Sequence, residues 1–241
     1  MADSKKMKHL IKRKKLSENI HVLTIACKWG GNLLLLEGDK CILLIDSGYR
    51  STREELQMYL KQEYKKPLKV LINTHHHGDH TGGNNILSAD DCELYIHKNA
   101  DMYYENFQAV NKIHENTTFV FGGFEISLYP RGGGHSISDV IIGIDKNHIL
   151  HLGDLLLSES FPLIGNKKQN DVRKLQKDLK FALDLCEDDT IIVPGHGKIM
   201  NKAEFIQYIN MIEETRQIVI KEIKNGVDLK SIKLSNILRE F

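Results

Sequence analysis

Histidine and aspartate are concentrated in one short stretch, residues 74–83, which reads Thr-His-His-His-Gly-Asp-His-Thr-Gly-Gly. The apolar residues 70–72 precede it and predict a strand that enters the core. A loop at the end of such a strand allows several side chains to face one point. Imidazole and carboxylate groups are the ligands that suit zinc, and iron and manganese are also compatible with them. The stretch therefore predicts a metal site.

Three further stretches offer single ligands of the same kind. They are Gly134-His135-Ser136, Leu152-Gly153-Asp154 and Pro194-Gly195-His196-Gly197. Each lies at a glycine-marked turn next to an apolar run. One histidine after a glycine is weak support for a site, but four such stretches in one chain are strong support. We expect the loops to converge on one side of a sheet sandwich.

Taken in chain order, His75-x-His77-x-Asp79-His80, Gly134-His135, Gly153-Asp154 and Gly195-His196-Gly197 resemble the motifs of the metallo-β-lactamase fold superfamily. The resemblance covers roughly residues 18 to 200. It implies an α/β fold, the αβ/βα four-layer sandwich, in which two mixed β-sheets pack together and helices cover the outer faces. The superfamily includes lactamases, glyoxalase II-like thioesterases, lactonases, nucleases and oxidoreductases, so the motifs do not identify the substrate.

The resemblance also implies a ligand set. It assigns one metal to His75, His77 and His135, a second to Asp79, His80 and His196, and a bridging position to Asp154. Seven ligands are too many for one tetrahedral zinc ion, whereas two ions about 3.5–4 Å apart that share a carboxylate and a water use all of them. We therefore expect two Zn²⁺ per chain, with iron or manganese as alternatives, and no organic cofactor.

Hydrolysis is the chemistry that this ligand set implies. We expect a hydroxide that bridges the two ions to attack the carbonyl of an ester, a thioester or a lactone, with Asp79 as the catalytic residue that orients it. A bridging Asp154 resembles the glyoxalase II and lactonase branches. The lactamase type of the family has a cysteine there and a lysine three residues later, where this chain has Leu157. β-Lactam hydrolysis is therefore not expected as the main activity.

Other functions of the superfamily remain alternatives. They are a phosphodiesterase or nuclease, a β-lactamase, and a sulfur dioxygenase with a single iron. A scaffold protein that binds metal without catalysis is a further alternative from a different class. A nucleic-acid enzyme is expected to carry a basic footprint, which a net charge of +1 does not provide. We expect a small-molecule substrate and no nucleic-acid partner.

Three polar residues near these motifs have open roles. Asp46 ends an apolar run, and it either supports the metal loop from behind or simply forms a turn. His76 is skipped by the ligand spacing, so we expect it to point away from the metals. His151 either packs in the core or supports the site from outside the ligand set.

The composition is that of an ordinary globular protein, with 41% hydrophobic and 27% charged residues. Residues 1–15 are basic and lack the apolar segment of a secretory signal, which predicts a disordered tail before one domain over residues 16–241. No stretch approaches the roughly 20 apolar residues that span a bilayer. The cysteines are scattered, which favours buried thiols in a reducing compartment. We expect a cytoplasmic protein and leave its oligomeric state open.

Apolar patterns and turn residues predict the main elements. Two apolar runs, residues 32–37 and 41–46, indicate a hairpin whose strands are covered on both faces. Ser51 and Glu54 match a capping box, which predicts a helix that ends at about residue 65. Further helices are predicted over residues 98–114, 171–187 and 201–224, the last with Asn201 as its N-cap.

Overall fold

The structure, a computed structural model, describes residues 11–26, 30–88, 91–103, 110–165 and 170–228. Two sheets form its centre. The seven strands of the first sheet are, in spatial order, β1 (Ile11–Ser17), β2 (Ile20–Ile25), β3 (Asn32–Glu37), β4 (Ile42–Ile45), β5 (Leu68–Ile72), β6 (Glu93–His97) and β7 (Val110–Ile113). The six strands of the second are β13 (Met200–Asn201), β12 (Ile191–His196), β11 (Ile149–Leu157), β10 (Val140–Ile144), β9 (Phe124–Pro130) and β8 (Thr117–Phe121).

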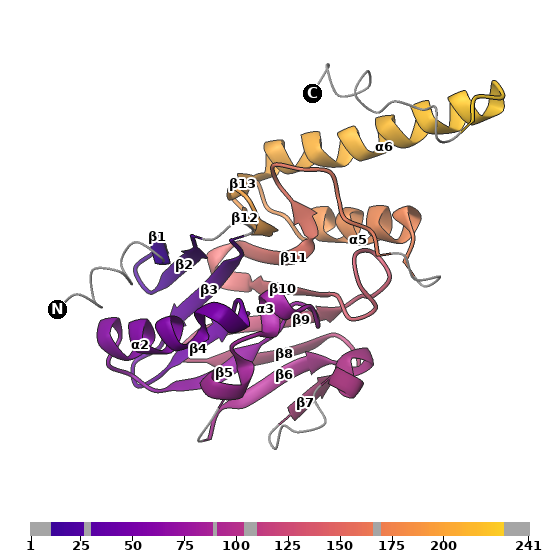
Figure 1. The fold of residues 1–241 in the computed structure, drawn as a ribbon. Coiled ribbons are helices and arrows are strands. Elements are labelled where there is room, and N and C mark those ends of the chain that lie inside the picture. Colours follow the sequence, from indigo (N-terminus) through magenta and orange to yellow (C-terminus); the bar gives the residue numbers. More distant parts are fainter. Residues whose placement is uncertain (1–10, 27–29, 89–90, 104–109, 166–169, 229–241) are drawn as a thin grey trace.

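The longer helices lie on the outer side of each sheet (Figure 1). The described helices are α2 (Arg53–Glu63), α3 (Gly78–Thr81), α4 (Asn84–Leu87), α5 (Val172–Asp184) and α6 (Lys202–Lys224), with the 3-10 turns η1 (Arg50–Thr52), η2 (Lys98–Tyr103) and η3 (Asp145–Asn147). Helix α2 covers the first sheet, and α5 and α6 cover the second. The far end of α6 extends beyond the sheets (Figure 1).

Three apolar cores separate the four layers. Strand β3 shows the reason, because its consecutive leucines point alternately to opposite faces. Leu34 and Leu36 pack in the core between the two sheets, whereas Leu33 and Leu35 pack in the core beneath α2. A third core lies between the second sheet and helices α5 and α6. The predicted αβ/βα four-layer sandwich is confirmed, as are strands covered on both faces.

The prediction of a disordered basic tail over residues 1–15 is wrong for residues 11–15. Residues 11–15 belong to β1, which pairs antiparallel with β2, while residues 1–10 lie outside the described chain. The four consecutive basic residues from Lys12 to Lys15 are exposed, and only Ile11 is buried. Backbone pairing, and not an apolar pattern, holds this edge strand, and charged side chains are typical of such edges.

Two predicted helices differ from the structure. In place of a helix over residues 98–114, the chain forms η2 and then β7, which pairs in parallel with β6; residues 104–109 lie outside the described chain. Helix α2 begins at Arg53, and its N-cap Thr52 makes no capping hydrogen bond. The Thr52 hydroxyl instead donates to the Tyr49 carbonyl at 3.2 Å. A local turn thus replaces the capping box that the sequence suggested.

The last helix begins as the sequence predicts. Asn201 accepts a hydrogen bond from the Glu204 N–H, and the Glu204 side chain accepts one from the Asn201 N–H. This capping box satisfies amide groups that the first turn of α6 would otherwise leave without partners. None of the helices in the described residues is both long and apolar enough to cross a membrane.

These two helix starts provide a test of the fold. Asn201→Ala removes a formed cap, so it is expected to lower the free energy of unfolding by about 1 kcal/mol. Ser51→Ala is the matched control, because it alters a capping pattern that the structure does not use, and its effect should stay within about 0.5 kcal/mol. Urea unfolding at fixed metal concentration measures both. Equal losses in the two variants would contradict the observed start of α2.

Candidate metal centre

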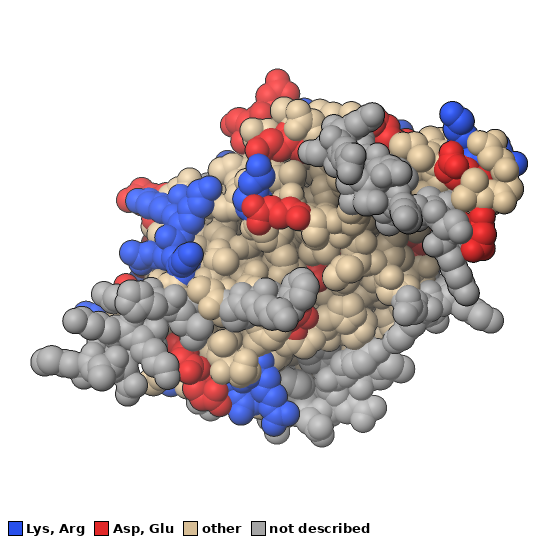
Figure 2. Space-filling view, turned by 45° about the horizontal axis from the view of Figure 1, so that its top comes forward, with Lys and Arg blue, Asp and Glu red and all other residues tan. Residues whose placement is uncertain are grey.

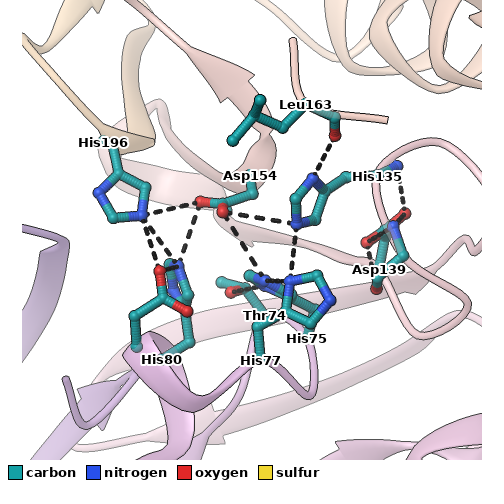
Figure 3. Close-up of polar contacts among 12 residues, drawn as sticks. Thr74, His75, His77, His80, His135, Asp139, Asp154, Leu163 and His196 are labelled. Atoms are coloured by element: carbon teal, nitrogen blue, oxygen red, sulfur yellow. Dashed lines mark hydrogen bonds and ion pairs between the residues drawn. The ribbon is translucent and has the colours of Figure 1, made fainter. Parts of the chain in front are cut away.

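The structure brings all seven predicted ligand side chains together (Figure 3). They form two groups of four that share one residue, and within each group the ligand atoms lie within 4.8 Å of one another. The first group, called group A below, is His75, His77, His135 and Asp154. The second, group B, is Asp79, His80, Asp154 and His196.

The ligand atoms of each group lie close enough to surround one small cation. In group A, Nδ1 of His77 lies 3.0 Å from Nε2 of His75 and 2.9 Å from Nε2 of His135. In group B, Nε2 of His196 lies 3.2 Å from Oδ2 of Asp79 and 3.3 Å from Nε2 of His80. Zinc bonds of 2.0–2.2 Å imply distances of roughly 3.3–3.6 Å between tetrahedral ligand atoms. The group B distances lie close to this range, whereas the two group A distances are shorter than it. Zinc therefore suits the residue types of both groups, with a small outward shift of the side chains in group A.

Asp154 offers one carboxylate oxygen to each group. Oδ2 lies 3.8 Å from His75 Nε2 and 3.5 Å from His135 Nε2. Oδ1 lies 3.1 Å from His80 Nε2 and 3.4 Å from His196 Nε2. Within the described chain, Oδ1 is buried and accepts no hydrogen bond of normal geometry. A buried carboxylate oxygen without such a partner is costly, and a cation held by group B would supply one to Oδ1.

An irregularity in β11 places Asp154. The pairing of β11 with β12 shifts around this residue, so that Gly153 pairs with Pro194 and Leu157 with His196. A Cβ atom on Gly195 would lie 2.0 Å from Asp154 Oδ1. Glycine is therefore required at this position, since any side chain would occupy the space of the carboxylate.

Asp46 holds one member of each group through two hydrogen-bond paths. His80 Nδ1 lies 2.7 Å from Asp46 Oδ2. The Thr74 hydroxyl donates to the same oxygen at 2.7 Å and lies 3.1 Å from His75 Nδ1. Each contact places a proton on the outer nitrogen of its histidine, which leaves the inner nitrogen with a lone pair for a metal. Of the two roles left open for Asp46, the structure favours support of the site.

Backbone carbonyls orient two further histidines. His135 Nδ1 donates to the Leu163 carbonyl at 2.6 Å, and His196 Nδ1 donates to the Gly30 carbonyl at 3.2 Å. No pattern of residues indicates these partners, because every residue has a carbonyl. Only the path of the chain brings Leu163 and Gly30 to the site.

The loop that carries His135 is held by Asp139. Its carboxylate accepts hydrogen bonds from the N–H groups of His135 at 3.0 Å and Ser136 at 2.9 Å. Ser138 connects this loop to the metal loop, since its Oγ lies 2.7 Å from His76 Nδ1. His76 is not part of either group, as expected. The polar spacing Ser136-x-Ser138-Asp139 was the available sign of this network, and these residues were not among the predicted site residues.

His151 supports the site from within β11. It is fully buried, its Nε2 lies 3.2 Å from the Asn32 carbonyl, and its Nδ1 accepts a hydrogen bond from the Gly153 N–H at 3.1 Å. These bonds hold the backbone next to Asp154. His151 is therefore both a packed core histidine and a support of the site.

Electrostatics distinguish the two groups. Burial lowers the pKa of His75 well below its usual value and also lowers the pKa of His77. Burial opposes the charged form of His80 as well, but the carboxylates of Asp154 and Asp46 outweigh it and hold the pKa of His80 well above its usual value. The pKa of His196 is raised against burial by its hydrogen bond to Asp79. Protons therefore compete with a cation mainly in group B.

Comparison with known proteins gives a consistent result. A family model described as the metallo-beta-lactamase superfamily matches residues 28–196. The chain is 23% identical over 208 residues to the metallo-beta-lactamase type 2 of Bacillus cereus, covering 82% of this chain and 81% of that protein. It is 25% identical over 212 residues to the enzyme of the same name from Bacillus sp. (strain 170), covering 82% and 80%.

Solved structures share the fold. The metallo-beta-lactamase from Pontibacter korlensis matches with a TM-score of 0.74 at 21% identity, covering 84% of this chain and 99% of that chain. At this level of identity, the structural likeness shows the fold alone.

The link through Thr74 leads to a first prediction for the site. Thr74→Val keeps the shape of the side chain but removes the hydroxyl that joins His75 to Asp46, so the zinc dissociation constant is expected to rise about 10- to 100-fold. Thr118→Val is the control, because that hydroxyl bonds Ser127 in the second sheet. Competition with a chelator measures both affinities. An unchanged affinity in Thr74→Val would show that the link does not orient the histidine.

The pKa directions lead to a second prediction. Because the pKa values of His80 and His196 are raised, a zinc ion that binds group B would have to displace protons near neutral pH, and a rise in pH would remove this competition. Affinity at group B should therefore increase by up to about tenfold per pH unit for each proton displaced. Affinity at group A should change less, because the pKa values of His75 and His77 are lowered. Stepwise zinc titration between pH 6 and 8 measures the two slopes, and equal slopes would contradict this assignment.

Proposed function

The chain belongs to the metallo-beta-lactamase superfamily and is accordingly a metal-dependent hydrolase, and we propose that it uses two zinc ions to hydrolyse a carbonyl ester, a thioester or a lactone. The observation that carries this proposal is the pair of four-atom groups that share Asp154. Histidine nitrogens and carboxylate oxygens are the ligand types of hydrolytic zinc sites. In each group, three ligands besides the shared carboxylate would hold the ion.

Bound zinc would supply a water of lowered pKa, about 7, and would polarise a carbonyl oxygen. Asp79 is the carboxylate that a water in the cavity reaches, since its side chain is 25% exposed and that of Asp154 only 6%. Burial would raise the pKa of Asp79, but the hydrogen bond to His196 and the charge of His80 lower it. Asp79 is therefore ionised at neutral pH and accepts the proton of the attacking water.

The overall reaction is a simple exchange of bonds. The oxygen of water joins the acyl carbon, and the bond from that carbon to the leaving oxygen or sulfur breaks. The proton taken up by Asp79 passes to the leaving group. The products are a carboxylic acid and an alcohol or thiol, or one hydroxy acid when the substrate is a lactone.

A cavity of about 450 Å³ opens beside Asp79, Asp154 and His196. This volume suits a small molecule. The Lys and Arg side chains of the face drawn in Figure 2 lie toward its edges, and the middle of that face is largely free of charged groups. A nucleic acid would need basic groups along the path of its phosphates, and the described residues in the middle of this face offer few of them.

β-Lactam hydrolysis is the second candidate, because both bacterial relatives described above carry the name metallo-beta-lactamase. Leu157 argues against it as the main activity. This residue lines the cavity, at the position where the lactamase type of the family is expected to have a lysine that binds the carboxylate of the drug. The carboxylate of a β-lactam would therefore lack that partner.

Metal analysis followed by a substrate panel tests the proposal. We expect two zinc ions per chain, and faster turnover of carbonyl esters, thioesters or lactones than of phosphodiesters or β-lactams. One iron per chain with oxygen consumption would contradict it, as would turnover of phosphodiesters or β-lactams alone.

The role of Asp79 needs its own variant. Asp79→Asn keeps the size of the side chain but accepts no proton, so kcat is expected to fall roughly 10²- to 10⁴-fold. Asp91→Asn is the control, because the Asp91 side chain is 92% exposed and pairs only loosely with Lys69 at 3.8 Å. Zinc content is measured alongside kcat. Full activity of Asp79→Asn at two zinc ions per chain would exclude this role.

A further inference from the structure

The cavity beside the metal centre has two chemically different walls. Its polar wall consists of groups already described, and its other wall is mainly apolar. The polar side chains are those of Asp79, Asp154 and His196, and the apolar wall includes Tyr49, Leu157 and Leu163. Ligand cavities of this kind use a few polar groups for orientation and an apolar surface for affinity.

Leu163 is the most informative residue of the apolar wall. Its side chain is unusual among large apolar side chains, because 63% of the residue is exposed. Its backbone carbonyl accepts the 2.6 Å hydrogen bond from His135 Nδ1. Figure 3 shows the Leu163 side chain above Asp154, directed toward the side of His196. The contact that orients a histidine of group A therefore also fixes an exposed leucine over the site.

Single exposed leucines are common on protein surfaces and need no explanation by themselves. Leu163 differs in two respects. It lines the same cavity as Leu157, which is only 4% exposed, so the two leucines extend one apolar surface from the interior to the cavity mouth. This surface lies in the same cavity as the carboxylates of Asp79 and Asp154. An apolar part of a substrate would bury the exposed area of Leu163, which water covers otherwise.

Charge makes the surface selective. None of the cavity-lining residues within the described chain is Lys or Arg. A carboxylate at the far end of a substrate would therefore lie against leucine side chains without a positively charged partner there. Leu163 lies at the exposed mouth of the cavity, so such a charge would lose part of its water there without gaining a positive partner among the described residues, which is unfavourable.

We propose that the substrate is an uncharged carbonyl ester, thioester or lactone with an apolar chain, and that this chain lies against Leu157, Leu163 and Tyr49. This inference rests on the proposed function, because it assumes that the carbonyl is placed at the metal centre. Leu163 is the residue that determines specificity for the apolar chain.

A matched series of esters tests the inference with the zinc-loaded protein. We expect kcat/KM to rise from p-nitrophenyl acetate through the butyrate to the hexanoate, by about 10- to 100-fold in total. Full burial of each methylene would give about fourfold, and partial burial gives less. The p-nitrophenyl monoester of adipic acid has six carbons like the hexanoate but ends in a carboxylate, and it should be at least about tenfold slower than the hexanoate.

Variants assign the effect to the residue. Leu163→Ala keeps the backbone carbonyl that binds His135 and should lose most of the dependence on chain length. Val120→Ala is the matched control, because Val120 is 73% exposed and lies on β8, outside the cavity; it should keep the full dependence. Leu163→Lys places a positive charge at an exposed position and should shift the preference toward the adipate monoester. Equal behaviour of the Leu163 and Val120 variants would overturn the inference.

A binding measurement separates this inference from the proposed function. Calorimetry with 2-octanone and 7-oxooctanoate compares an uncharged ketone with one of similar length that ends in a carboxylate. If 2-octanone binds more tightly than 7-oxooctanoate and this difference is lost in Leu163→Ala, the apolar chain site is supported. The same result without hydrolysis of any ester would overturn only the proposed hydrolysis of carbonyl esters. Two results together would overturn the apolar chain site alone: esters are hydrolysed without preference for hexanoate over acetate, and 2-octanone binds no more tightly than 7-oxooctanoate.

Discussion

The shared carboxylate of Asp154 is the interaction on which the rest of the site depends. It is 6% exposed and lies between histidine nitrogens of both groups, at 3.1 to 3.8 Å. A buried carboxylate requires positive charge or hydrogen bonds close to it. Protons on His80 and His196 supply that charge, and a metal ion bound there would have to replace them. The same charge balance explains why the pKa of Asp154, which burial would raise, is held well below its usual value by His80.

Polar bonds join the two sheets at the end where the site lies. The Val140 N–H donates to the Thr74 carbonyl at 2.8 Å, which connects the start of β10 to the metal loop after β5. The Asn32 amide donates to the carbonyls of Pro194 at 3.0 Å and Gly197 at 2.9 Å, on both sides of His196. An apolar core holds the remainder of the two sheets together, and apolar contacts have no strict direction. Directional bonds are placed where the ligand positions must be accurate.

The segment after β11 connects metal binding to the cavity. The Leu163 carbonyl orients His135, and the Leu163 side chain lies over the centre. The Asn170 amide donates to the His135 carbonyl at 2.9 Å, so the return of the chain toward α5 also contacts this histidine. One histidine ligand is thus held by chain segments on both sides of residues 166–169. A change at Leu163 or Asn170 would therefore affect the position of His135, and a change at Leu163 would also affect the shape of the cavity.

Residue types and spacing determined much of this protein. They identified seven side chains that the structure brings together, and the apolar strands β3 and β4 whose pattern requires cover on both faces. Tertiary structure decided the partners that have no pattern in the sequence. The carbonyls of Leu163 and Gly30 are ordinary backbone atoms, and β1 consists largely of exposed basic residues that join a sheet only because β2 offers its edge. The physical reason is that ligand chemistry and side-chain hydrophobicity are properties of each residue. The pairing of a strand and the carbonyl oxygen beside a histidine depend instead on which distant segment of the chain packs next to them.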